Sequence, residues 1–102
     1  MTESASFFDE LHLATELETL PEWRRAVGSR QAIVKEFVFR DFKQAWAFMS
    51  RIAAEADARN HHPEWSNVYN RVSILLTTHD AGGVTTKDIA LARFSEEAKT
   101  LV

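Results

Sequence analysis

The chain has 102 residues, the usual length of a single domain. Its 12 Lys and Arg and 15 Asp and Glu give a formal net charge of −3, which excludes a strongly basic nucleic-acid binder and a highly acidic tail. With 45% hydrophobic residues and no cysteine, the chain can form a core but not a disulfide scaffold, a thiolate nucleophile or a cysteine-ligated metal site.

Neither a membrane span nor a targeting segment is predicted. No apolar run approaches the roughly 20 residues that cross a bilayer, and the first ten residues lack the features of a secretory signal. We therefore expect one cytoplasmic domain over residues 1–102, with its core at about 7–100, and neither a membrane nor a nucleic-acid partner.

The first predicted element is a helix over about residues 6–19. Ser4 and Ser6 are its candidate caps, and Pro21 disfavours its continuation. Trp23 is expected to anchor the start of a sheet. The helix prediction rests on apolar residues that recur at spacings of three and four: Phe7, Phe8, Leu11, Ala14 and Leu17.

Residues 31–39 alternate as a β-strand does. Ile33, Phe37 and Phe39 share one face with Lys35, whereas Ala32, Val34 and Val38 share the other with Glu36. Both faces are largely apolar, so we expect both to be at least partly covered.

A second helix is predicted over residues 41–59. Asp41 is its expected N-cap, Gln44 completes a capping-box-like pair, and Asn60 suits the helix exit. Apolar residues that recur at steps of three and four predict one buried stripe: Phe42, Ala45, Trp46, Met49, Ile52, Ala53 and Ala56. The aromatic and methionine positions of this helix are expected in the core.

Two strands and a last helix complete the chain. Strands are predicted at about 67–70 and 72–79, followed by a turn at Gly82–Gly83. Thr85 and Asp88 resemble a capping box that opens a helix to about Thr100, with Ile89, Ala92 and Leu101 facing inward. This order predicts an α+β fold, a four-stranded antiparallel sheet with three helices packed on one face.

Histidines gather at two places in this scheme. His61 and His62 precede Pro63 in a loop, and His79 ends a predicted strand. If these ends meet, the three imidazoles would line one cleft together with Asp57, Asn60 and Asp80. Imidazole titrates near neutrality, so such a cleft can give and take protons.

Two other interpretations of the histidines stay open. The His-His-Pro run also suits a purely structural loop, and the three histidines with a carboxylate could bind a metal. A lone histidine such as His12, on the first helix, is more often structural or solvent-exposed than catalytic.

The spacing of these residues resembles the signature of the pterin-4a-carbinolamine dehydratases. Asp57 stands four residues before the His-His-Pro run, and an aromatic residue, a histidine and an aspartate follow it at the family's intervals as Tyr69, His79 and Asp88. Asn60 departs from the pattern, because an aspartate is common there. The likeness extends upstream to Trp23 and the apolar strand and covers about residues 7–100.

The resemblance implies an activity. Family members dehydrate 4a-hydroxytetrahydropterin, including 4a-hydroxytetrahydrobiopterin, to the quinonoid dihydropterin, which supports tetrahydrobiopterin recycling. They need no metal and no redox cofactor, because the pterin is the substrate. The resemblance also implies a homodimer or homotetramer, with an aromatic amino acid hydroxylase as pathway partner.

It also implies roles for individual residues. His61, His62 and His79 are the expected catalytic residues, with His62 or His79 as the acid on the hydroxyl and His61 as a pterin contact or base. Trp65 and Tyr69 are expected to support the loop from the core. The expected substrate-binding set is Asp57, Asn60, His61, His62, Pro63, Thr78, His79, Asp80 and Ala81.

Other functions are compatible with the same residues. A protein of this fold could be a non-catalytic oligomerisation partner or transcriptional coactivator, although a pure scaffold has no need of three imidazoles in one cleft. A small metal-dependent hydrolase is the third alternative.

Overall fold

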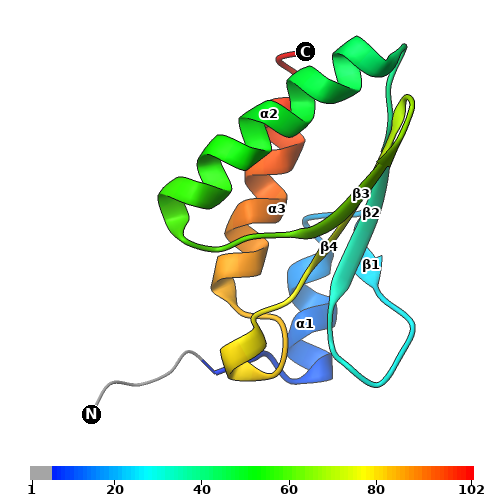
Figure 1. Ribbon diagram of the computed structural model, residues 1–102. Helices are drawn as coiled ribbons and strands as arrows, with labels where there is room; N and C mark the ends of the chain where they lie inside the picture. Colours follow the sequence, from blue (N-terminus) through cyan, green and yellow to red (C-terminus); the bar gives the residue numbers. More distant parts are fainter. Residues whose placement is uncertain (1–5) are drawn as a thin grey trace.

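A four-stranded antiparallel sheet carries the fold, and helices pack against one of its faces (Figure 1). The computed structural model describes residues 6–102. The elements follow in the order α1 (Glu10–Leu17), β1 (Arg24–Arg25), β2 (Ile33–Val38), α2 (Phe42–Arg59), β3 (Glu64–Val68), β4 (Arg71–Leu76), the 3-10 turn η1 (His79–Ala81) and α3 (Thr86–Lys99). The predicted α+β architecture is confirmed.

The strands lie in the order β1-β2-β4-β3. The crossover through α2 leads from β2 to the edge strand β3, and β4 then returns between β3 and β2. Lys35 pairs with Ile74 and Phe37 with Val72, which places every second residue of both strands on the core side. The side chains of this inner face are buried: Ile33, Lys35, Phe37, Val72, Ile74 and Leu76. The face predicted for Ile33, Lys35 and Phe37 is therefore confirmed.

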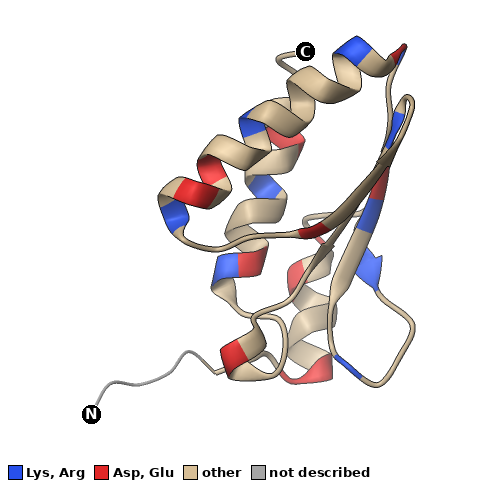
Figure 2. Cartoon of the chain, viewed as in Figure 1, with Lys and Arg blue, Asp and Glu red and all other residues tan. Residues whose placement is uncertain are grey.

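The outer face of the sheet is open to solvent. Glu36 and Val38 are exposed there, and Val34 and Leu75 are only half-buried. Both faces of β2 were expected to be at least partly covered, and on the outer face this holds only for its first half. Acidic and basic residues both occur along α2 and α3 (Figure 2).

Helix α2 begins and ends where predicted, but only part of the predicted stripe is buried. Asp41 Oδ1 accepts a hydrogen bond from the Gln44 backbone N–H at 2.9 Å, and Asn60 ends the helix in the left-handed conformation. Ala45, Ile52 and Ala56 are buried as expected, together with Phe48. The expectation that all aromatic positions are core is wrong, because Phe42 and Trp46 lie on the neighbouring stripe and Trp46 is 57% exposed.

Helix α1 differs more from its prediction. Asp9 caps it by accepting from the His12 backbone N–H at 2.7 Å, whereas Ser6 lies ahead of the cap and Ser4 lies outside the described residues. Leu13 is the buried residue of the helix, while Phe7 and Leu11 are exposed. Trp23 is buried at the start of the sheet, as expected.

The last two strands are shifted relative to the sequence pattern. β3 begins at Glu64, and Tyr69 occupies a tight turn with φ of 51°, where it is exposed rather than part of the core. Trp65 is half-buried against the core, as expected. β4 ends at Leu76, so the strand prediction over 77–79 is wrong and His79 lies on η1.

Helix α3 has the predicted capping box of Thr85 and Asp88. Ile89 and Ala92 are buried, but Leu101 is exposed beyond the helix end. Within residues 6–102, no helix has the length and apolar character needed to cross a membrane.

Candidate active site

His61, His62 and His79 line a single hollow of about 350 Å³. Its lining residues come from the segment after α2, the start of β3, the segment 77–80 that includes η1, and the first turn of α3. Its remaining lining residues are Asn60, Glu64, Thr77, Thr78, Asp80 and Lys87. All nine lining residues are polar or charged, and the size of the hollow falls in the range of small-molecule sites.

The end of α2 determines where the first two histidines lie. Asn60 adopts φ of 52° and ψ of 43°, a left-handed conformation that asparagine tolerates better than most residues. The His61 backbone N–H then donates to the Ala56 carbonyl at 3.0 Å, which closes the helix end. Pro63 prevents further helix, so the chain leaves α2 with both imidazoles beside the sheet edge.

His61 has a buried carboxylate partner. Its Nε2 lies 2.6 Å from Asp88 Oδ1, and the Asp88 side chain is fully buried while that of His61 is 11% exposed. Asp88 Oδ2 accepts from the Thr85 backbone N–H at 2.8 Å and from the Thr78 hydroxyl at 2.7 Å. A buried carboxylate is costly unless it is hydrogen-bonded in this way.

The other two histidines are more accessible. His62 Nε2 lies 3.2 Å from Asp57 Oδ1, and both side chains are largely exposed. His79 is exposed on η1, which is held by hydrogen bonds from the Ala81 and Gly82 backbone N–H groups to the Thr78 carbonyl. The site therefore combines one anchored imidazole with two that solvent and ligand can reach.

Glu64, at the rim of the hollow, is held by an arginine from another segment. Arg30 donates from both terminal nitrogens to the two carboxylate oxygens of Glu64, each at 2.9 Å. These hydrogen bonds raise the pKa of Arg30 above its usual value. Glu64 is therefore engaged by a bidentate pair. Asp80 is the other carboxylate that lines the hollow.

Most of the predicted site residues come together. Asn60, Thr78 and Asp80 line the hollow with the three histidines. Asp57 does not line it but contacts the lining residue His62. Pro63 and Ala81 are neighbours of lining residues and do not themselves line the hollow. Because Asp88 and Asp57 each pair with one histidine of the His-His run, both histidines have a carboxylate partner although position 60 is an amide.

Sequence reasoning missed several contributors. Glu64, Thr77 and Lys87 also line the hollow, and nothing in their spacing marks them. Asp88 belongs both to the family spacing and to the predicted capping box, but neither pattern predicts its contact with His61. One of its oxygens completes that box while the other contacts His61, so both interpretations apply to the same carboxylate.

The geometry of the described residues provides no ligand set for the alternative in which the histidines bind a metal. In the part of the chain that the structure describes, no group of three or more His, Asp or Glu side chains is placed to hold a metal ion. The carboxylate partners of His61 and His62 instead favour hydrogen-bond and proton-transfer chemistry at these two histidines.

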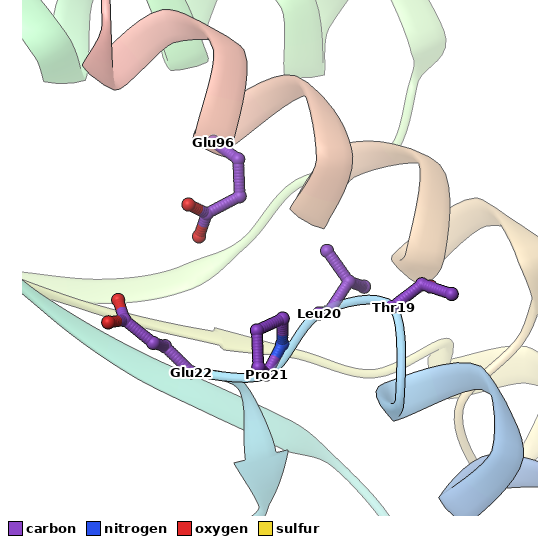
Figure 3. Close-up of a pocket in the computed structure, with 5 residues that line it drawn as sticks. All are labelled: Thr19, Leu20, Pro21, Glu22 and Glu96. Atoms are coloured by element: carbon purple, nitrogen blue, oxygen red, sulfur yellow. The ribbon is translucent and has the colours of Figure 1, made fainter.

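A second hollow, of about 320 Å³, lies between residues 19–22 and α3 (Figure 3). Its charged residues, Glu22 and Glu96, both bind the buried Lys35 ammonium, at 2.9 and 2.6 Å. The single ammonium offsets one of the two negative charges, and no histidine lines this hollow. The histidine hollow is therefore the candidate active site.

Comparisons with known proteins show the family of this chain. The family model described as "Pterin 4 alpha carbinolamine dehydratase" matches residues 7–98. A protein of Burkholderia orbicola (strain MC0-3), named "Putative pterin-4-alpha-carbinolamine dehydratase", is 56% identical over 84 residues, which cover 82% of this chain and 81% of the relative.

Two solved structures share the fold. A "transcriptional coactivator/pterin dehydratase" from Brucella melitensis superposes with a TM-score of 0.88 at 39% identity, covering 92% of this chain and 99% of that one. A "pterin dehydratase-like protein", described as a RuBisCO assembly factor in the alpha-carboxysome, superposes with a TM-score of 0.66 at 24% identity, covering 76% and 89%. At that identity the second likeness concerns the fold alone.

Proposed function

Because this chain belongs to the pterin-4a-carbinolamine dehydratase family, we propose that it converts 4a-hydroxytetrahydrobiopterin to the quinonoid dihydropterin by histidine acid–base catalysis. The observation that carries the proposal is the convergence of His61, His62 and His79 on one hollow. The pterin is the substrate, and the proposal includes neither a metal nor a redox cofactor.

The reaction needs one proton given and one removed. A proton donated to the 4a-hydroxyl lets the C4a–O bond break and water leave. Removal of the proton on N5 lets the C4a=N5 double bond form, so the substrate becomes product plus one water. Histidine suits both transfers because its imidazole changes protonation state near neutral pH.

We assign the roles from exposure and partners. His61 is the pterin contact or base, because its bond to buried Asp88 fixes its ring. His62 or His79 is the acid on the hydroxyl, since both rings can reach a bound ligand. The remaining substrate-binding residues are expected to hold the pterin ring or to shape its loop: Asp57, Asn60, Pro63, Thr78, Asp80 and Ala81.

Stopped-flow decay of the carbinolamine tests this proposal. The wild type should accelerate the decay, and His61→Ala, His62→Ala and His79→Ala should each lower kcat by about 10²- to 10⁴-fold. His12→Ala is the matched control, because His12 lies on α1 outside the hollow. If His62→Ala and His79→Ala stay folded and as fast as the parent, the proposal is wrong.

We also propose a homodimer or homotetramer and a role in tetrahydrobiopterin recycling beside an aromatic amino acid hydroxylase. The stacked and exposed rings of Phe42 and Trp46 on α2 support self-association, because large apolar patches are costly to leave in water. Sedimentation velocity would measure the assembly state directly.

A folded chain that leaves the carbinolamine decay unchanged would favour the non-catalytic alternative of an oligomerisation partner or coactivator. The cytoplasmic location stays a prediction.

A further inference from the structure

Two buried threonine hydroxyls lie behind the histidine hollow. Thr78 Oγ1 is 2.7 Å from Asp88 Oδ2 and 2.7 Å from Thr85 Oγ1. Thr78 and Thr85 are both buried, and neither hydroxyl lacks a hydrogen-bond partner. The cluster connects η1, the first turn of α3 and, through Asp88, the His61 ring.

The direction of each hydrogen bond in this cluster follows from the donors available. An ionised carboxylate only accepts, so the Thr78 hydroxyl must donate its one proton to Asp88. The Thr85 hydroxyl must then donate to Thr78 Oγ1, while Thr85 Oγ1 accepts from the Lys87 backbone N–H at 3.2 Å. The order is therefore Thr85 to Thr78 to Asp88.

The hydrogen bonds that hold Asp88 also determine which of its oxygens contacts His61. With one oxygen held by the Thr78 hydroxyl and the Thr85 backbone N–H, the other oxygen is aimed at His61 Nε2. An acceptor at Nε2 fixes the proton of the neutral imidazole on that nitrogen. Nδ1 is then the ring nitrogen that carries the free lone pair.

We propose that Thr78 is a positioning residue of the dehydratase, acting through Asp88 to hold His61 in the Nε2–H tautomer. The proposal rests on the function proposed above, and it differs from the substrate-binding role expected of the Thr78 backbone, which any side chain at this position would leave in place. Asp88 contacts the His61 ring directly. The other titratable groups that line the same hollow are His62, Glu64, His79, Asp80 and Lys87.

Thr78→Val and Thr78→Ser form the matched pair for the test. Valine keeps the shape and removes the hydroxyl, whereas serine keeps the hydroxyl and removes the methyl group. Long-range ¹⁵N–¹H correlation spectra of the imidazoles, without substrate, report the tautomer, and a His61→Gln sample assigns the His61 signals. We expect the Nε2–H tautomer in the wild type and in Thr78→Ser, and a mixture of tautomers in Thr78→Val.

Kinetics provide the second measurement. We expect Thr78→Val to lower kcat by about tenfold, the size of one hydrogen bond to a charged group, with KM changed less than twofold. A carboxylate that has lost this donor binds the protonated imidazole more strongly, so the acid limb of the pH–rate profile should move to higher pH. Thr78→Ser should recover most of the lost rate and the position of the limb.

Three results would overturn the inference. The first is an Nδ1–H tautomer of His61 in the wild type, which needs no variant to fold. The second is a folded Thr78→Val with the wild-type tautomer and pH profile, and the third is a Thr78→Ser that recovers neither. Absence of any dehydratase activity in the wild type would instead overturn the proposed function, while the tautomer would still decide the arrangement around His61.

Discussion

The Lys35 ammonium lies 2.6 Å from Glu96 Oε2, joining the inner face of the sheet to α3. Lys35 is 4% exposed, and its second carboxylate partner, Glu22, lies at 2.9 Å. Glu96 also accepts from the Trp23 indole N–H at 2.9 Å. A lysine on a core face is tolerated here because both of its carboxylate partners still reach solvent.

The first prediction compares the two ends of this ion pair. Glu96→Ala leaves a buried ammonium with a single partner and removes the acceptor of Trp23, so we expect a loss of about 2–4 kcal/mol in unfolding free energy. Lys35→Met removes the buried charge and frees two solvent-accessible carboxylates, so we expect a loss of only about 1 kcal/mol. Urea unfolding measures both, with Glu36→Ala as the control for an exposed pair with Arg71. The reverse order would contradict this account.

A second prediction concerns pH. The hydrogen bond from Lys35 lowers the pKa of Glu22 below its ordinary value of 4.5. A lowered folded-state pKa stabilises the fold above that ordinary value, and the contribution is lost as pH falls through the folded-state pKa. The stability difference between wild type and Glu22→Gln should therefore shrink between pH 7 and pH 3. Glu18→Gln, at an exposed glutamate with no ion pair within residues 6–102, should show a smaller change, and equal behaviour would refute the assignment.

The third prediction concerns the start of α2. Asp41 accepts from the Gln44 backbone N–H, and this hydrogen bond lowers the pKa of Asp41. Asp41→Ala should cost about 1 kcal/mol, the usual size of an N-cap, whereas Asp41→Asn keeps an acceptor and should cost less. Thermal unfolding followed by circular dichroism separates the two. Equal losses would mean that the cap contributes through charge alone.

Gly83 gives a fourth prediction. A Cβ atom on Gly83 would lie 2.5 Å from Gln31 Oε1 and 2.8 Å from Phe7, and Gln31 Oε1 already accepts from the Val84 backbone N–H. Gly83→Ala should therefore destabilise the fold and displace the turn that carries His79. Gly82→Ala meets no atom within 4 Å, so only its left-handed φ of 80° is strained, at about 1–2 kcal/mol. Chemical-shift changes at His79 should be larger for Gly83→Ala.

The fifth prediction separates two aromatic residues of α2. Phe48 is fully buried against Phe37 and Phe39, so Phe48→Ala should cost about 3–5 kcal/mol. Phe42 is exposed in the single chain, and Phe42→Ala should cost less than about 1 kcal/mol at low protein concentration. A cost that grows with concentration would indicate that Phe42 is covered in an assembly.

Local chemistry made the ends of α2 and α3 predictable. Asp41, Asn60 and the pair Thr85 and Asp88 act on backbone groups within a few residues, so their roles can be recognised without the rest of the fold. The face that α2 buries depends on where the sheet and α3 lie. Phe42 and Trp46 continue an apolar stripe beside the buried one, and the spacing alone does not tell the two stripes apart.

The lining of the hollow was predictable in part. Spacing along the chain marked His61, His62 and His79, and the predicted set also included Asn60, Thr78 and Asp80, which line the same hollow. The bond between His61 and Asp88, in contrast, joins residues 27 positions apart. Lys87 and Glu64 line the hollow only because the first turn of α3 and the start of β3 border it. Such neighbours follow from tertiary packing, which no single stretch of sequence encodes.

Asp88 serves at once as a helix cap and as the anchor of His61. Fraying of the first turn of the C-terminal helix would therefore release the imidazole at the same moment, and the hollow would lose its ordered ring before the sheet loosened. Amide hydrogen exchange at residues 85–88 should accordingly run in step with loss of the ordered His61 ring. Molecules in which the first turn of α3 has opened should form a separate population, in which the His61 ring is no longer held by Asp88.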